Sequence, residues 1–233
     1  MLSNMEIKRI RSLREKKFRD ALGLFVVEGD KMVAEALSSG MEVVRVVRKE
    51  DVGEAVMSRI SSLSTPPPSL SVVRMPLPSG PGKPEGLCLA LDSIRDPGNL
   101  GTILRLSDWF GVDSIFASPD TVEAYNPKVI QASMGAIFRK RLIYCNLPDL
   151  CRSFTAASLP VFGTFLDGHD IYSTALSKEG LIVMGNEADG ISPEVEREIT
   201  MRLTIPSFAA GPTAESLNVA VATAITLSEF KRR

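Results

Sequence analysis

Residues 86–118, GLCLALDSIRDPGNLGTILRLSDWFGVDSIFAS, indicate the fold class. Their first part, GLCLAL (86–91), is a short, wholly apolar run of the kind that lies buried in a parallel sheet. After the loop DSIRDPGNLG comes an amphipathic helix ending at Phe110, with Gly111 well placed as its C-cap and VDSIFAS (112–118) as the next strand. This stretch predicts one βαβ unit of a parallel sheet.

The alternation of strands and helices continues along the rest of the chain. Asn126 and Pro127 read as the N-cap and first position of a helix through about Ile137. Strands that alternate with helices predict a mainly parallel sheet covered on both faces. The further strands are expected at 141–145, 160–165, 181–185 and 202–206, and the further helices from about Pro148, from Ser192-Pro193 and from near Ser216.

A proline- and glycine-rich stretch, MPLPSGPGKPEG (75–86), divides the chain. It cannot continue a helix or a central strand, so it predicts a linker between two domains, 1–80 and 81–233. The front domain has no motif with a positioned acid, base or nucleophile, and we expect a recognition module with the fold of a small α/β sandwich. Its elements are a helix over about 5–20, strands over 24–29, 43–47 and 69–75, and helices over 30–38 and about 51–60.

Composition excludes several classes of protein. The 233 residues include 27 Lys and Arg, 28 Asp and Glu, one His and three Cys, which is close to the globular average. One His excludes a His-rich metal site, and the cysteines lack C-x-x-C spacing, so we expect no metal. No run of 18 apolar residues is present, so we expect no membrane partner, and the few thiols fit a cytoplasmic location.

Basic side chains gather near the N-terminus. Residues 1–80 carry 13 basic and 10 acidic side chains, whereas residues 81–233 carry 14 and 18. Such a cluster fits a contact with nucleic acid phosphates, but it equally fits the solvated face of an amphipathic helix. The cluster consists of Lys8, Arg9, Arg11, Arg14, Lys16, Lys17 and Arg19.

Three glycine-containing loops fall where ligands bind in such sheets, beyond the carboxyl ends of the strands. They are RDPGNLG (95–101), GNEADG (185–190) and IPSFAAGPTAESLN (205–218). None matches G-x-G-x-x-G or the G-x-x-x-x-G-K-[ST] phosphate loop, which disfavours a pyridine dinucleotide or ATP. Glycine-rich joints between strand and helix still favour an adenosine-type ligand, the alternative being that each loop is only a tight turn.

Together, these loops resemble the motifs of the SpoU/TrmH-type RNA ribose 2′-O-methyltransferases of the SPOUT class. NLGTILR supplies the family's Asn, Gly and Arg, and LIVMGNEADG supplies its Gly-x-Glu loop. The third motif is matched by Ile-Pro followed by Ser-Leu-Asn-Val. VEGDKMVAEAL (27–37) is similar to the ribosomal-protein-like substrate-binding domain often fused in front. The matching residues are Asn99, Gly101, Arg105, Gly185, Asn186, Glu187, Gly190, Ile205, Pro206, Ser216, Leu217, Asn218 and Val219.

The chain departs from this family at two places. The family usually has Met after Ile-Pro, where this chain has Ser207, and the segment 207–215 is longer than usual. Ala220 stands where Ser is common. The first difference affects one wall of the expected cofactor site.

The resemblance implies a trefoil-knotted parallel-sheet domain, the SPOUT α/β knot, behind the small α/β sandwich domain. General rules of chain connection do not predict a knot. The resemblance also implies S-adenosylmethionine as cofactor, RNA as partner, and a homodimer formed through the C-terminal domain. The expected cofactor-binding residues are Thr164, Leu166, Gly185, Asn186, Ile205, Leu217 and Asn218.

The resemblance further implies methyl transfer to a ribose 2′-hydroxyl of rRNA or tRNA. It makes Arg105 the catalytic arginine, with Asn99, Glu187, Ser216 and Asn218 around it. Since a guanidinium has a pKa above about 12, we expect Arg105 to hold the adjacent phosphate rather than to act as a free base. We also expect Ser216 to cap the last helix, which leaves Asn218 for function. The alternative function is a non-catalytic RNA-binding or ribosome-assembly relative that keeps the fold.

Overall fold

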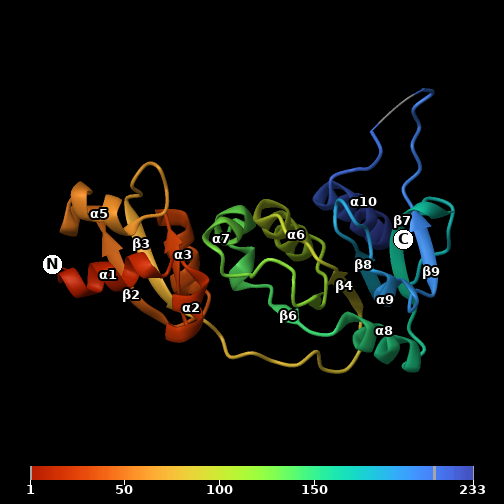
Figure 1. The fold of residues 1–233 in the computed structure, drawn as a ribbon, viewed down its shortest axis with the longest axis horizontal. Coiled ribbons are helices and arrows are strands. Elements are labelled where there is room, and N and C mark those ends of the chain that lie inside the picture. The colour runs from red at the N-terminus through yellow and green to blue at the C-terminus, as the bar shows by residue number, and fades with distance from the viewer. Residues whose placement is uncertain (1, 212–213, 233) are drawn as a thin grey trace.

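The structure, a computed structural model, describes residues 2–211 and 214–232, and these residues form two sheets (Figure 1). One sheet has three antiparallel strands in the order β1-β3-β2, and the other has six parallel strands in the order β6-β5-β4-β8-β7-β9. The predicted fold class, a parallel-sheet α/β unit behind a small α/β unit, is confirmed, while the knot stays a prediction. The strands are β1 (Leu24–Glu28), β2 (Val43–Arg48), β3 (Ser69–Arg74), β4 (Leu87–Leu91), β5 (Ile115–Ala117), β6 (Leu142–Tyr144), β7 (Val161–Asp170), β8 (Gly180–Met184) and β9 (Met201–Thr204).

Helices connect nearly all of these strands. Residues 75–86 form neither helix nor strand and connect the two sheets as an extended segment, as their proline and glycine content predicts (Figure 1). None of the helices in the described residues combines the length and apolar composition that crossing a lipid bilayer requires. The helices are α1 (Asn4–Ser12), α2 (Lys16–Leu22), α3 (Asp30–Ser38), α4 (Lys49–Val52), α5 (Glu54–Ile60), α6 (Pro97–Trp109), α7 (Pro127–Ser133), the 3-10 turn η1 (Ala136–Phe138), α8 (Leu147–Ala156), α9 (Pro193–Glu196) and α10 (Val219–Arg232).

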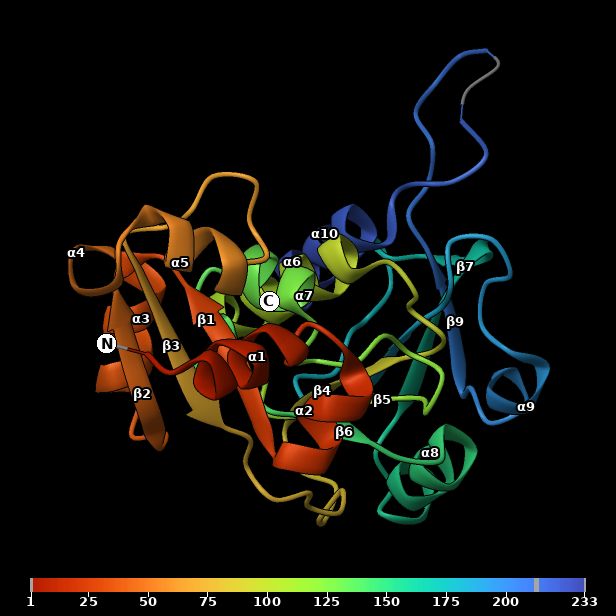
Figure 2. The same ribbon diagram turned by 60° about the vertical axis from the view of Figure 1, so that its left-hand side comes forward.

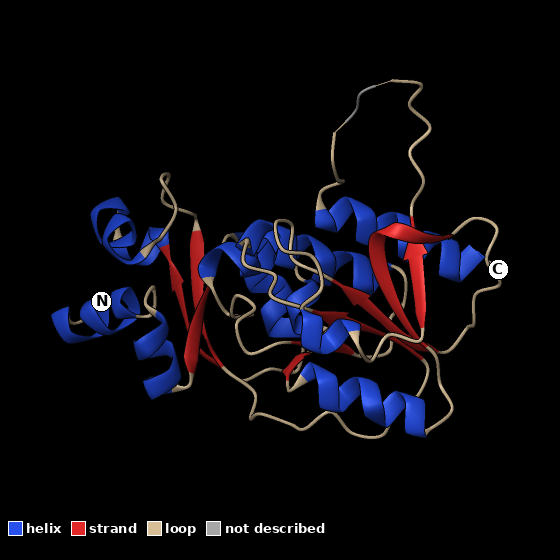
Figure 3. Cartoon of the chain, turned by 45° about the vertical axis from the view of Figure 1, so that its right-hand side comes forward, coloured by secondary structure: helices blue, strands red, loops and turns tan. Residues whose placement is uncertain are grey.

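Both faces of the six-stranded sheet are covered by helices (Figure 3). The central strand β4 shows the alternation: Leu89 and Leu91 lie in the core shared with α6, α7 and α10, whereas Cys88 and Ala90 lie in the core shared with α8 and α9. All four side chains are buried. A strand buried on both faces explains why GLCLAL contains no polar residue.

The front unit packs against the second unit through β1, α3 and α7. The ring of Phe25 on β1 lies 4.6 Å, between centroids, from that of Tyr125. Ile130 on α7 belongs to the same buried cluster as Phe25 and Met32. Figure 2 shows the small sheet standing in front of the larger one. The two units therefore share an apolar contact besides the linker.

The prediction of a single N-terminal helix over 5–20 is wrong, because the helix is interrupted between α1 and α2. Arg19 on α2 places Nη1 2.7 Å from the carbonyl oxygens of both Leu13 and Arg14 and donates to them. These carbonyls follow the end of α1, where a helix leaves acceptors unsatisfied. A side chain from the next helix thus replaces the hydrogen bonds of a continuous helix.

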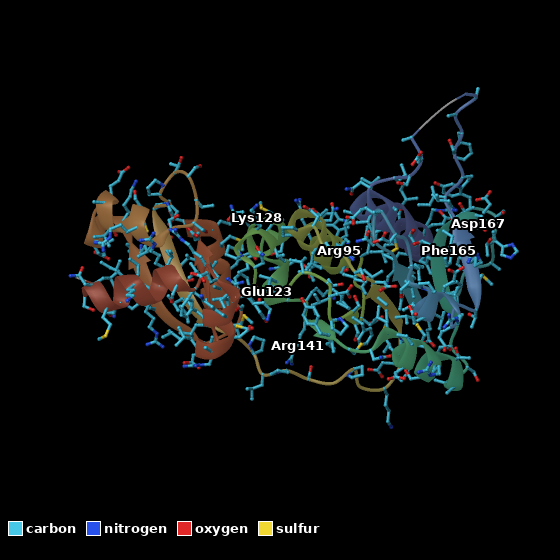
Figure 4. All side chains as sticks on the ribbon, in the orientation of Figure 1. Arg95, Glu123, Lys128, Arg141, Phe165 and Asp167 are labelled. Carbon is cyan, nitrogen blue, oxygen red and sulfur yellow. The ribbon has the colours of Figure 1, made fainter. Side chains whose placement is uncertain are left out.

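Strand β7 is longer than the predicted 160–165. Thr164 and His169 both pair with Leu203 of β9, so the residues between them bulge out of the sheet. The guanidinium of Arg202 lies 3.6 Å from the ring centre of Phe165 and also donates to Asp167 at 2.7 Å (Figure 4). Bulges of this kind re-aim side chains at the edge of a sheet.

Candidate active site

The side chains of Asn99, Glu187 and Asn218 form one hydrogen-bonded chain. Nδ2 of Asn99 donates to Oε1 of Glu187, and Oδ1 of Asn99 accepts from Nδ2 of Asn218 at 3.0 Å. The two contacts span 88 and 119 residues of sequence. One residue from each of the three motif loops therefore meets at one place.

Asn99 is fixed by the start of α6. Its backbone N–H donates to Oδ1 of Asp96, the N-cap, at 2.8 Å, and Pro97 occupies the first helical position. Pro at the first position and Asp as N-cap both favour a helix start at this point. The side chain of Asn99 thus leaves the first turn of α6, close to the carboxyl end of β4.

Glu187 lies in a tight loop after β8. A Cβ at Gly185 would lie only 2.3 Å from the backbone carbon of Gly190, so the loop can close only around glycine. Oδ1 of Asn186 accepts from the backbone of Ala188 at 2.8 Å, and its Nδ2 donates to the carbonyl oxygen of Ser93 at 2.7 Å. The Asn186 side chain therefore holds this loop to the loop after β4.

Asn218 is the cap of α10, contrary to the expectation that Ser216 takes this role. Its Oδ1 accepts from the backbone N–H groups of Ala220 at 3.0 Å and of Val221 at 3.3 Å. Ser216 is exposed two residues earlier. Asn218 therefore has a structural function through Oδ1 while its Nδ2 reaches Asn99.

Arg105 is exposed on α6 and forms no hydrogen bond or ion pair with any residue that the structure describes. Helical side chains lean toward the N-terminus of their helix, which for Arg105 is the end that carries Asn99. Gly101 lies between them on α6, and a Cβ there would come within 2.5 Å of Cβ of Ala132 on α7. The motif glycine thus allows α6 and α7 to cross closely. Arg105 itself, without a partner among the described residues, can bind an anion.

The residues predicted to bind the cofactor lie on β7 and in the segments after β8 and β9, and these three strands are neighbours in the sheet. Thr164 is half-buried and donates from Oγ1 to the carbonyl oxygen of Val183 at 3.1 Å. Leu166 and Leu217 are 76% and 49% exposed, and Ile205 is half-buried. These apolar side chains lie on the surface of the single chain rather than inside an enclosed pocket.

A hollow of about 260 Å³ lies beside these loops, at the ends of β4 and β5. Asp92, Ser93 and Asp120 contribute to its wall, and it contains none of the residues predicted for catalysis or cofactor binding. Oδ2 of the buried Asp92 accepts from the backbone and hydroxyl of Ser192, both at 2.7 Å. Hydrogen bonds from Ser118 and Ser93 lower the pKa of Asp120. The polar groups here hold the loop after β4 in place.

Burial disfavours a nucleophilic role for the three cysteines. Burial raises the pKa of Cys88 to about 11 and that of Cys151 to about 12, and it also raises the pKa of Cys145. The thiolate is the reactive form, and a raised pKa makes it scarce at neutral pH.

The predicted RNA-binding cluster is only partly available. Arg19 does not fit this prediction, because it is 2% exposed and forms an ion pair with Glu123 of the second unit, which Figure 4 labels. It is therefore not accessible to RNA. Arg14 is exposed but donates to the carbonyl oxygen of Ser61. Lys16 and Lys17 are exposed and form ion pairs with Asp20 and Glu15, whereas Lys8, Arg9 and Arg11 are exposed without such a carboxylate among the described residues.

Sequence reasoning missed two contacts at this site, the cap by Asn218 and an approach of Arg95 to Asp189 at 3.8 Å between the first two loops. Arg95 and Asp189 are 94 positions apart, so no local pattern predicts their approach. The cap by Asn218 depends on the position at which α10 starts.

Comparisons with known proteins agree with the geometry. The profile of the SpoU rRNA Methylase family matches residues 86–228, and that of the MRM3-like substrate binding domain matches residues 4–64. The 23S rRNA (guanosine(2553)-2′-O)-methyltransferase RlmP of Bacillus subtilis is 29% identical over 98% of this chain and 96% of its own length. Among solved structures, a TrmH-family protein from Porphyromonas gingivalis is 42% identical with a TM-score of 0.90, covering 100% of this chain and 99% of that one. An AdoMet-bound rRNA methyltransferase from Sinorhizobium meliloti is 32% identical with a TM-score of 0.86, covering 100% and 96%.

Proposed function

The chain belongs to the SpoU rRNA methylase family, and from this premise we propose that it transfers a methyl group from S-adenosylmethionine to a ribose 2′-hydroxyl of ribosomal RNA. The observation that carries the proposal is the hydrogen-bonded chain of Asn99, Glu187 and Asn218, which joins three loops at the carboxyl edge of the sheet. Arg105 follows Asn99 on the same helix, α6. A relative of full length named as a 23S rRNA 2′-O-methyltransferase supports rRNA over tRNA.

The residues on β7 and in the segments after β8 and β9 fit S-adenosylmethionine. Leu166, Ile205 and Leu217 offer apolar surface to an adenine, and the backbone around Gly185 offers donors and acceptors to its edge. Thr164 supports this wall through its bond to β8. When bound, the cofactor supplies a methyl group already activated on a sulfonium.

The protein must then orient the ribose. Arg105 binds the phosphate next to the target nucleotide, since guanidinium groups pair well with phosphate and Arg105 has no carboxylate partner among the described residues. Asn99 lies at the N-terminal end of the same helix, and with Glu187, its hydrogen-bond partner from the loop after β8, it holds the 2′-hydroxyl in line with the methyl group. Asn218 keeps Asn99 in place.

A homodimer completes the proposed enzyme. Trp109 on α6 is 85% exposed, and Val221 on α10 is 49% exposed. Because α6 and α10 pack together in one core, these residues lie on neighbouring helices, and a second copy of the chain would cover them. We further propose the domains 1–80 and 81–233, the trefoil knot around residues 181–230, and a cytoplasmic location.

The test is methyl transfer by the purified protein. Ribosomal RNA from cells that lack the gene is incubated with S-adenosylmethionine, and 2′-O-methyl groups are mapped. Arg105→Ala should abolish transfer while changing cofactor affinity only a few-fold, since Arg105 contacts the RNA. An intact protein that binds RNA but transfers no methyl group to any nucleotide would favour the alternative, a non-catalytic RNA-binding relative.

A further inference from the structure

We propose that Glu187 accepts the proton of the ribose 2′-hydroxyl during transfer, an inference that rests on the proposed methyltransferase activity. The observation behind it is the direction of the hydrogen bonds that end at this carboxylate. A backbone N–H can only donate, so the first contacts of the chain fix the direction of those that follow.

The direction is set at the start of α10. Oδ1 of Asn218 accepts from the N–H groups of Ala220 and Val221, so Nδ2 is the atom that Asn218 presents to Asn99. Asn99 must accept with Oδ1, and its Nδ2 must then donate to Glu187. The capping of α10 thus sets the orientation of both side-chain amides and makes an N–H group the atom that contacts Glu187.

Glu187 is therefore held as an acceptor. Its Oε1 takes the hydrogen bond from Asn99, and its Oε2 has no hydrogen-bond partner in the part of the chain that the structure describes. The side chain is exposed at the loop tip, where a ribose can approach it. Oε2 is therefore an acceptor with lone pairs open to a ribose hydroxyl.

The other charged groups around this place are engaged or unsuited. Asp96 caps α6 through Oδ1, and Asp189 lies 3.8 Å from Arg95. A guanidinium group is a hydrogen-bond donor with no acceptor atom, so Arg105 is unsuited to take a proton. The only histidine of the chain, His169, pairs with β9 beyond the bulge of β7.

The proposed step is balanced. The 2′-oxygen forms a bond to the methyl carbon while the carbon–sulfur bond breaks, and the electron pair of that bond stays on sulfur. The proton leaves the 2′-oxygen for Oε2 of Glu187 and later passes to water. A carboxylate is a weak base toward an alcohol, but the oxygen becomes strongly acidic as it gains the methyl group, much as the catalytic-loop Asp of kinases takes a hydroxyl proton.

The decisive variant is Glu187→Gln. Its Oε1 can still accept from Asn99, but it cannot take a proton, so kcat should fall about 100-fold or more. The affinities for S-adenosylmethionine and for RNA, measured by calorimetry and filter binding, should stay near those of the wild type. Asp189→Asn, in the same loop, is the matched control and should keep nearly full kcat.

Glu187→Ala gives a second readout that a positioning role would not move. Removing the side chain leaves space for a small carboxylate, so added formate should restore part of kcat, and chloride at equal ionic strength should not. Full kcat in Glu187→Gln, a loss seen only in RNA affinity, or no response to formate would each overturn the assignment. Failure of the proposed function itself is distinct, because the wild type would then transfer no methyl group.

A separate observation concerns the front unit, and we infer that an unstacked nucleobase of the RNA substrate binds in a groove between α1 and β2. The groove has a volume of about 180 Å³. Its floor is apolar and includes the buried Ile10, Leu13 and Leu24, and Val44, 45% exposed, forms one wall.

The rim of this groove is basic. Arg9 and Arg45 stand at its edge, and Lys8 and Arg11 are exposed nearby on α1. Arg9 has no carboxylate partner among the described residues, while Arg45 forms an ion pair with Glu6 at 3.2 Å. Proteins hold splayed bases on apolar or guanidinium surfaces and the flanking phosphates on basic groups. The match of residues 4–64 to a substrate binding domain supports RNA as the occupant.

Two variants test this groove in the full-length protein. Arg9→Ala and Val44→Asp should each weaken RNA binding about fivefold or more, with unchanged cofactor affinity and unchanged kcat at saturating RNA. Lys31→Ala removes an exposed basic residue of α3 that does not line the groove and is the matched control. Unchanged RNA affinity in both variants would overturn the inference. It would also be overturned if the variants lost the dimer but kept their RNA affinity, since the groove would then bind a second copy of the chain.

Discussion

Arg19 on α2 and Glu123 of the second unit form an ion pair whose side chains are only 3% and 16% exposed. The pair joins the front unit to the methyltransferase unit next to the contact of Phe25 with Tyr125. A basic residue near the N-terminus thus serves the seam between the units rather than the RNA.

Arg19→Ala should destabilise the protein by about 3–5 kcal/mol, because it leaves Glu123 unpaired in a mostly buried place. It also removes the donors to the carbonyls of Leu13 and Arg14. Urea unfolding measures the change. Lys16→Ala, an exposed neighbour, should cost less than about 0.5 kcal/mol, and an equally small loss for Arg19→Ala would show that the seam does not depend on the pair.

Asn218→Asp separates the two functions of Asn218. The carboxylate can still cap α10, so stability should change by less than about 0.5 kcal/mol. It cannot donate to Asn99, so methyl transfer should slow about tenfold or more. Asn218→Ala should lose about 1 kcal/mol as well, through the missing cap. Wild-type kcat in the Asp variant would contradict the proposed importance of the hydrogen-bond direction.

Gly101→Ala should destabilise the fold by about 1–3 kcal/mol, although helix propensity alone favours alanine. The added Cβ would lie 2.5 Å from Cβ of Ala132 and 2.7 Å from the carbonyl oxygen of Val129. The double variant Gly101→Ala with Ala132→Gly should recover part of the loss. Thermal unfolding of both variants tests this, and a more stable Gly101→Ala protein would rule out the tight crossing of α6 and α7.

Trp109→Glu should convert the proposed dimer into a monomer, because it places a charge on an exposed apolar residue that we propose a second copy covers. Trp109 is 85% exposed in the single chain, so the change should alter monomer stability by less than about 0.5 kcal/mol. Light scattering after gel filtration gives the mass. Met5→Glu, 80% exposed on α1, is the control and should keep the wild-type mass.

The sequence predicts the βαβ unit at 86–118 and the meeting of the three loops, because both follow from local periodicity and from the rule that strand ends share one edge. It does not predict that Asn218 caps α10, since Ser216 is an equally good cap when only neighbouring residues are considered. The break after Leu13 is hidden for a related reason: Arg19 supplies the missing donors from the next helix. The burial of Arg19 depends on Glu123, 104 positions away.

The bond between Asn99 and Asn218 also orders events in time. Asn218 is synthesised 119 residues after Asn99, a delay of roughly 6 to 24 s at ordinary rates of translation. Until Asn218 has been made, the hydrogen-bonded chain that orients the amide of Asn99 toward Glu187 is incomplete.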